Sequence, residues 1–215
     1  MKRNKCVLVI GHSYVRRMKD YIDKGNDRDH NFSLVSDKIS TNYISIPGGR
    51  VNGILNMIRK QIPYSKSTLA IVLAGGNDLD GGGQEPGYTA DTLLEIARAL
   101  QNRGYEYVIL SQIIRRQAGS AFIEKMTECN LRLESLCSRE NRISFWVHAR
   151  INRANNIHEH DGTHLNDVGN ALLYRSFKNA ISHTLAHQAR NHEPCRCKPL
   201  DGTEHGRRRG GRRHR

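Results

Sequence analysis

The sequence has no long hydrophobic run, and this limits where the protein can work. The first apolar segment, Cys6–Ile10, follows a basic opening but is only about five residues long, too short for the hydrophobic region of a secretory signal peptide. No other stretch stays apolar for the roughly 20 residues that a membrane-spanning helix needs. We therefore expect an intracellular protein, cytoplasmic or nuclear, without a membrane span.

Cysteine is sparse and irregularly placed. The sequence has five cysteines, an odd number without the density of a disulfide framework, which favours a reducing compartment. Their positions are Cys6, Cys129, Cys137, Cys195 and Cys197. The last two lie near His192 and His205, but the four residues do not have a recognised zinc spacing, so we predict no metal site there.

Negative charge is scarce relative to positive charge. The chain of 215 residues has 34 Lys and Arg against 21 Asp and Glu, a net charge of +13. Residues 190–215 hold nine basic and three acidic residues and end in RRRGGRRHR, which has no apolar side chain to anchor it. We expect one domain over residues 1–188 and a basic, disordered tail over 189–215. Such a tail either neutralises phosphates of nucleic acid or anionic lipid, or only keeps the protein soluble.

Short apolar runs alternate with amphipathic stretches, which is typical of an α/β domain with a mostly parallel sheet. Strands are predicted at Cys6–Ile10, Tyr43–Ile46, Leu69–Leu73, Tyr107–Ile114 and Ile143–Val147. Helices are predicted at Tyr14–Ile22, Val51–Lys60, Thr89–Asn102, Ala121–Ser138 and Val168–His187. This order predicts helices on both faces of a five-stranded sheet, with ligands at the carboxyl ends of the strands.

Four polar motifs stand where that rule places function, three after predicted strands and one before the last helix. They are Gly11-His12-Ser13, Pro47-Gly48-Gly49, Gly75-Gly76-Asn77-Asp78 and Asp161-Gly162-Thr163-His164. Each has an ordinary explanation: a serine N-cap, a Gly-Gly turn, an Asx turn and a plain loop. Together they supply the nucleophile, base, orienting acid and oxyanion donors that acyl transfer needs.

The chemistry of these residue types assigns each a candidate role. A serine hydroxyl attacks well only when an imidazole removes its proton, so His164 is the candidate base for Ser13. Asp161, three residues earlier, can orient the second ring nitrogen. The Asn77 amide and the backbone N–H of Gly49 are candidate oxyanion donors, each worth about 3 to 4 kcal/mol. Gly48 can take the place of Gly49.

In this order the four blocks resemble those of the SGNH hydrolases, the group that includes the GDSL lipases and esterases. Gly75–Asp78 and Asp161–His164 match the last two family blocks residue for residue. The resemblance implies a flavodoxin-like three-layer α/β/α sandwich, a triad of Ser13, Asp161 and His164, and no cofactor. His12 departs from the family, which usually has Asp before the serine, and this bears on how the serine loop is positioned. The first block, GHSYVRR, also resembles esterase-like domains encoded by some retrotransposons.

The sequence supports two functions from different classes. One is a serine esterase that cleaves a small acyl ester through an acyl-serine intermediate; the same machinery also suits an acyltransferase. The other is a nucleic-acid-binding accessory protein of a mobile element, with a hydrolase-like scaffold and an Arg-rich tail that makes the contacts. With no broad apolar insertion, a small or polar substrate is favoured over a long-chain lipid.

Other polar residues near the motifs carry weaker predictions. Arg115 and Arg116 follow the fourth predicted strand and either reach the crevice to bind an anionic substrate or are solvated, as surface arginines usually are. A further group precedes the triad loop without metal-ligand spacing and is interpreted as a polar loop. Its members are His148, Arg150, His158 and His160.

Overall fold

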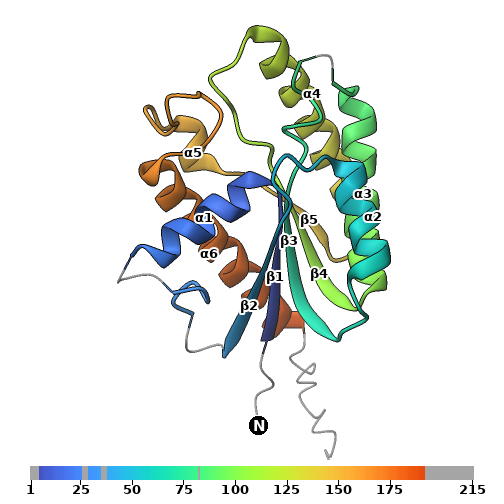
Figure 1. The fold of residues 1–215 in the computed structure, drawn as a ribbon. Helices are drawn as coiled ribbons and strands as arrows, with labels where there is room; N and C mark the ends of the chain where they lie inside the picture. The colour runs from blue at the N-terminus through green and yellow to red at the C-terminus, as the bar shows by residue number, and fades with distance from the viewer. Residues whose placement is uncertain (1–4, 26–28, 35–37, 82, 192–215) are drawn as a thin grey trace, which may run out of the picture.

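A computed structural model describes residues 5–25, 29–34, 38–81 and 83–191. Within this part of the chain, five strands form one parallel sheet in the order β2-β1-β3-β4-β5 (Figure 1). The strands are β1 (Lys5–Gly11), β2 (Ile39–Ser45), β3 (Ser67–Leu73), β4 (Tyr105–Ser111) and β5 (Ile143–Trp146). The predicted five-stranded parallel sheet is confirmed.

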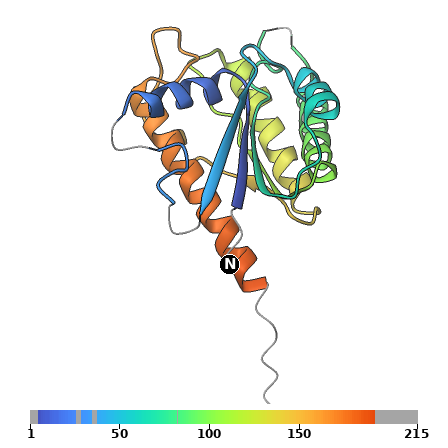
Figure 2. The same cartoon turned by 60° about the horizontal axis from the view of Figure 1, so that its bottom comes forward.

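Helices cover both faces of the sheet and complete a three-layer sandwich (Figure 1, Figure 2). One face carries α2 (Val51–Gln61), α3 (Pro86–Asn102) and α4 (Ser120–Cys137). The other face carries α1 (Ser13–Asp23), α5 (Ala149–Arg153) and α6 (Asp167–Asn191). Each face of the sheet has its own hydrophobic core. Because side chains alternate along a strand, β1 contributes to both: Leu8 packs in the first core and Val9 in the second. The predicted α/β/α architecture is confirmed.

The predicted element boundaries differ from the structure in several places. The strand predicted at Tyr43–Ile46 begins at Ile39 and ends at Ser45. The strand predicted to reach Ile114 ends at Ser111. Just beyond it, the Asn130 side chain accepts from the Ile113 N–H at 2.9 Å and donates to the Ile113 carbonyl at 3.1 Å, replacing a neighbouring strand. The helix predicted from Thr89 begins at Pro86, which suits a first helical turn because proline lacks an N–H. The short helix α5 was not predicted.

The C-terminal helix runs beyond the predicted domain boundary at residue 188 and ends at Asn191. The rest of the predicted tail lies outside the described residues, as do His192, Cys195, Cys197 and His205. Among the helices that the structure describes, none is both long and apolar enough to cross a membrane.

Candidate active site

Ser13 stands at the junction of β1 and α1, at the carboxyl edge of the sheet. Gly11 lets β1 pass close to β3, since a Cβ there would lie 2.1 Å from the Leu73 carbonyl oxygen. The His12 N–H donates to that same oxygen at 3.3 Å. Ser13 then begins the helix, and its backbone N–H is one of the first-turn amides that have no partner within a helix. An oxyanion beside Ser13 would meet the positive end of α1.

The residue that caps α1 is His12 and not Ser13. His12 adopts extended backbone geometry, and its Nδ1 accepts from the Tyr14 N–H at 3.5 Å. The interpretation of Ser13 as a simple N-cap is therefore wrong. Because the His12 imidazole accepts the first-turn N–H of α1, the Ser13 hydroxyl is not needed as the cap and is available for other contacts.

The structure brings Ser13, His164 and Asp161 into one hydrogen-bonded chain. The His164 Nε2 lies 3.1 Å from the Ser13 Oγ, and its Nδ1 lies 2.6 Å from the Asp161 Oδ2. The first of these contacts joins residues that are 151 positions apart in the sequence. The arrangement has the distances that a serine nucleophile, its base and an orienting carboxylate require.

Asp161 also shapes the loop that carries His164. Its Oδ1 accepts from the backbone N–H of Thr163 at 2.9 Å and of His164 at 2.8 Å, so this segment forms an Asx-type turn where the sequence suggests a plain loop as the ordinary explanation. The hydrogen bond from the His164 ring, followed by those from the backbone, holds the pKa of Asp161 well below its usual range. An ionised carboxylate only accepts, so Nδ1 of His164 carries the proton and Nε2 is left to accept from Ser13.

The triad loop is tied to α1 from the side. The Tyr14 hydroxyl, on a side chain that is almost fully buried, donates a short hydrogen bond to the Thr163 carbonyl. Tyr14 follows Ser13 and Thr163 precedes His164, so this bond ties the segment of the candidate nucleophile to that of the candidate base. The sequence gives no local signal of it, because the two residues are 149 positions apart.

Asn77 and Gly49, the predicted oxyanion donors, lie together but differ in what their N–H groups do. The Asn77 Nδ2 donates to the Gly49 carbonyl at 3.1 Å, which leaves its second hydrogen for another acceptor. The Gly49 N–H points to the Ile46 carbonyl at 2.8 Å and closes the turn through Gly48. Gly49 can donate to an oxyanion only if that bond is shared or broken, so Asn77 and the Ser13 amide are the better placed donors.

Asp78 anchors the third block from beneath. Its side chain is fully buried, and its two oxygens accept from the Val51 N–H at 3.1 and 3.2 Å, at the start of α2. Burial raises the pKa of Asp78 to about 6, although the Val51 amide acts in the opposite direction. Asp78 therefore fixes the chain just after Gly49 instead of facing a substrate.

The other polar candidates have separate environments. Arg115 is exposed, whereas Arg116 is buried, so the prediction of a solvated arginine is wrong for Arg116. His148 is buried with its Nδ1 2.8 Å from the Ser176 Oγ, and the His158 Nε2 lies 2.9 Å from the Arg115 carbonyl. His160 and Arg150 are exposed. Across the described residues, no group of three His, Cys, Asp or Glu side chains could hold a metal ion.

Two buried imidazoles make stability depend on pH. Burial lowers the pKa of His148 to about 3, and burial with the charges of Arg116 and His164 does the same for His12. An unfolded histidine has a pKa near 6.5, so between these values the unfolded chain binds protons that the folded chain does not. Each histidine therefore lowers the free energy of unfolding by about 1.4 kcal/mol per pH unit as the pH falls from about 6.5 towards 3. The raised pKa of Asp78 opposes one of these two contributions between about pH 6 and pH 4, so the net stability still falls.

We expect His148→Gln to flatten this dependence in urea unfolding measured between pH 7 and pH 4, because the variant lacks one of the two groups. Leu131→Ala, which changes an exposed side chain and no titratable group, is the control and should keep the wild-type slope. Equal slopes for His148→Gln and the wild type would show that His148 is not neutral in the fold.

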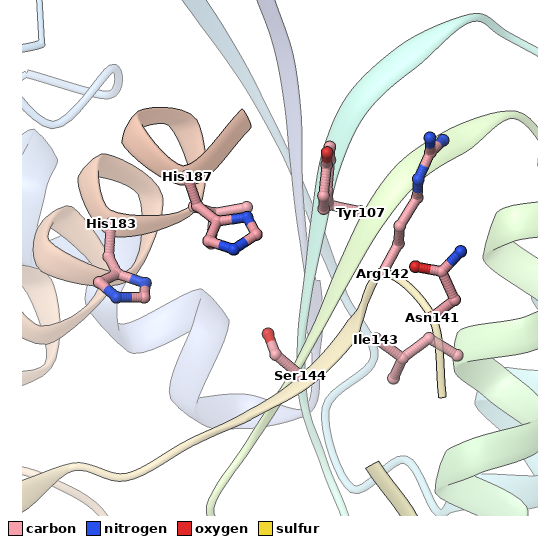
Figure 3. A pocket seen from close by; sticks show the side chains of 8 residues that line it. Tyr107, Asn141, Arg142, Ile143, Ser144, His183 and His187 are labelled. Atoms are coloured by element: carbon pink, nitrogen blue, oxygen red, sulfur yellow. The ribbon is translucent and has the colours of Figure 1, made fainter. Parts of the chain in front are cut away.

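A separate hollow of about 420 Å³ lies away from the triad (Figure 3). Figure 3 shows His183 and His187, from the C-terminal half of α6, on one side of it and Tyr107 and Arg142 on the other. Its strand residues come from the amino-terminal parts of β4 and β5, whereas the triad lies at the carboxyl edge. None of the predicted site residues lines it.

The layers and the sheet order define a three-layer α/β/α sandwich around a five-stranded parallel sheet. No protein-family model matches the chain, and no curated protein matches it in sequence. Solved structures do match in fold. One of them is named as a putative acylhydrolase from Bacteroides fragilis. It has a TM-score of 0.65 and 20% sequence identity, and the match covers 86% of this chain and 90% of that one. The fold is thus the SGNH, or GDSL-like, hydrolase fold that the four blocks predict.

Two further solved structures extend this likeness. A GDSL-like lipase from Bacteroides thetaiotaomicron has a TM-score of 0.62 and 22% identity, over 85% of this chain and 90% of that one. A variant of an acetyl-xylooligosaccharide esterase from a Geobacillus has a TM-score of 0.62 and 14% identity, over 82% and 94%. At such identities the likeness concerns the fold.

Proposed function

We propose that the protein is a serine esterase that hydrolyses a short acyl ester through an acyl-serine intermediate. The observation that carries the proposal is the continuous chain from the Ser13 Oγ to the His164 Nε2, at 3.1 Å, and from the His164 Nδ1 to Asp161, at 2.6 Å. It lies at the carboxyl edge of a parallel sheet, where ligands of such folds bind.

In the first half-reaction the Ser13 oxygen attacks the ester carbonyl carbon while His164 takes the hydroxyl proton. The carbonyl oxygen becomes an anion, stabilised by the Ser13 amide and the free N–H of Asn77. When the tetrahedral species collapses, the bond to the alcohol oxygen breaks and His164 returns its proton to that oxygen. The alcohol leaves and the acyl group stays on Ser13.

In the second half-reaction a water molecule repeats these steps. His164 removes a proton from the water as its oxygen attacks the acyl carbon, and the proton then passes to the Ser13 oxygen as the acid departs. Asp161 remains ionised throughout and stabilises the imidazolium that forms twice in each cycle. An acceptor alcohol in place of water would give acyl transfer with the same residues.

A small or polar acyl group suits this site. The loop that carries His164 is exposed at Asp161, so the site is open to solvent on this side. An acetyl or similarly short ester needs little apolar surface beyond the reacting atoms. The acylhydrolases and the acetyl-xylooligosaccharide esterase among the structural neighbours support ester cleavage as the reaction class.

The proposal is tested by trapping the nucleophile. A phosphonyl fluoride should react with the purified protein by attack of the Ser13 oxygen and loss of fluoride, and peptide mass spectrometry should place one stable adduct on Ser13. Ser13→Ala should not react, whereas Ser120→Ala, which changes an exposed serine at the start of α4, should react like the wild type. An adduct elsewhere, or none in a folded wild type, would contradict the proposal.

A further inference from the structure

Arg116 is a buried cation beside the candidate oxyanion hole. Only 5% of the residue is exposed, although it belongs to the loop that follows β4. Its Nη2 donates to the Asn77 Oδ1 at 2.7 Å, and its Nη1 donates to the Asp80 Oδ2 at 2.9 Å. The guanidinium therefore bridges the side chains of two residues in and next to the Gly75–Asp78 block.

The surroundings are shaped to hold this guanidinium. Gly76 leaves room for it, since a Cβ there would lie 2.9 Å from the Arg116 Nη2. The ring of Phe122, in α4, lies with its centroid 5.3 Å from the guanidinium carbon, a cation–π distance. The Arg116 Nε is buried without a hydrogen-bond partner, which costs stability. The hydrogen bonds to Asn77 and Asp80 and the Phe122 ring nevertheless hold the guanidinium in one orientation.

The contact with Asn77 decides which way the carboxamide faces. A carboxamide has an accepting oxygen and a donating nitrogen, and rotation by half a turn exchanges them. Arg116 has donors only, so it binds the oxygen and directs the nitrogen to the Gly49 carbonyl, where the Nδ2 donates at 3.1 Å. In the reversed orientation the Asn77 Oδ1 would face the Gly49 carbonyl oxygen, and neither could donate. The carboxamide oxygen would also take the place of the N–H that is proposed to bind the oxyanion.

Arg116 also lies close to the triad half of the site. Burial raises the pKa of the Tyr14 hydroxyl, while the charge of Arg116 acts in the opposite direction. Tyr14 in turn donates to Thr163, in the loop of His164. The same guanidinium thus adjoins the oxyanion donor and the residue that ties the base to the nucleophile.

We propose that Arg116 is a positioning residue for the reaction: it fixes the Asn77 carboxamide so that one N–H binds Gly49 and the other is kept for the oxyanion. This inference rests on the proposed esterase function. It gives Arg116 a role different from binding an anionic substrate, because two of its nitrogens are already occupied by Asn77 and Asp80.

A double-mutant cycle on kcat tests this role, with Arg116→Lys, Asn77→Ala and the combination assayed on a short-chain chromogenic ester. Lysine keeps the charge but lacks the planar fork that bridges two acceptors. We expect Asn77→Ala to lower kcat by about 100- to 1,000-fold, as loss of one oxyanion donor does. Arg116→Lys should lower kcat by about 10- to 100-fold with KM little changed. The double variant should match Asn77→Ala.

Two controls separate positioning from structural damage. Arg132→Lys, at an exposed arginine paired with Asp91, should keep the wild-type kcat. Urea unfolding shows whether Arg116→Lys is folded. If Arg116→Lys does not fold, Asp80→Ala takes its place in the cycle. The Asp80 side chain is 55% exposed, so its removal should be tolerated. It frees the Nη1 side of the guanidinium and leaves the buried Arg116 side chain in place. Its effect on kcat should also vanish in the Asn77→Ala background.

Several results would overturn the inference. If Arg116→Lys lowers kcat by the same factor in the wild type and in the Asn77→Ala background, Arg116 does not act through Asn77. A rise in KM at constant kcat would make Arg116 a substrate-binding group instead. Wild type that reacts with the phosphonyl fluoride and hydrolyses esters, but gives an additive cycle, refutes only this inference; wild type that does neither refutes the esterase as well.

Discussion

Ser13→Ala and His164→Ala are each expected to lower kcat for a short-chain ester by about 10⁴- to 10⁶-fold, and the double variant should lose no more than the worse single one. The reason is that the two side chains perform one step. Without the His164 Nε2, 3.1 Å from the Ser13 Oγ, the hydroxyl keeps its proton, and without the hydroxyl the imidazole has no nucleophile to activate.

The measurement is a kcat and KM series on the wild type and the three variants, with urea unfolding to show that each is folded. Residual hydrolysis above the uncatalysed rate is expected, because the oxyanion donors still bind the developing charge. Multiplicative losses in the double variant would mean that Ser13 and His164 act in separate steps. Activity retained by Ser13→Ala would remove Ser13 as the nucleophile.

The elements of the fold could be predicted because their signals are local. β1 and β3 are continuous apolar runs, as strands buried on both faces should be, and α3 and α4 have apolar residues at helical spacing. The alternation of strands and helices then restricts the topology, since crossovers between parallel strands are right-handed. Glycine and polar residues at the strand ends indicate the edge of the sheet at which Ser13 contacts His164.

Contacts between distant segments could not be predicted in this way. The sequence places Arg115 and Arg116 side by side after one strand, yet one is exposed and the other is buried against Asn77. Nothing within the loop distinguishes them, because the difference depends on the space that Gly76 leaves and on Phe122 from α4. A buried arginine is rare enough that a surface position is the natural expectation.

In the Pro47-Gly48-Gly49 block, the sequence likewise could not predict the direction of one backbone N–H, that of Gly49. A glycine after the second strand suggests a backbone donor that comes close to a ligand. Whether that donor is free depends on the turn, and here the Gly49 N–H meets the Ile46 carbonyl at 2.8 Å. The residue type could be predicted from the block, whereas the direction of its amide required the structure.

Asp161→Asn is the second large change expected, a loss of about 10²- to 10⁴-fold in kcat with the fold retained. The asparagine oxygen can still accept from the Thr163 and His164 amides, now at 2.9 and 2.8 Å, so the turn should persist. Its NH₂ group would then face the His164 Nδ1, 2.6 Å away in the wild type. Facing a donor, Nδ1 must become the acceptor, and the ring proton moves to Nε2.

With the proton on Nε2, His164 donates to Ser13 where it should accept, so the base is present in the wrong tautomer. Glu159→Gln is the matched control, since it neutralises an exposed carboxylate in the same loop, and it should change kcat by less than a few-fold. If Asp161→Asn lost no more activity than this control, Asp161 would serve only the turn, and another group would have to orient His164. A loss confined to kcat, with KM unchanged, assigns the Asp161 side chain to the proton-transfer step that Ser13 needs.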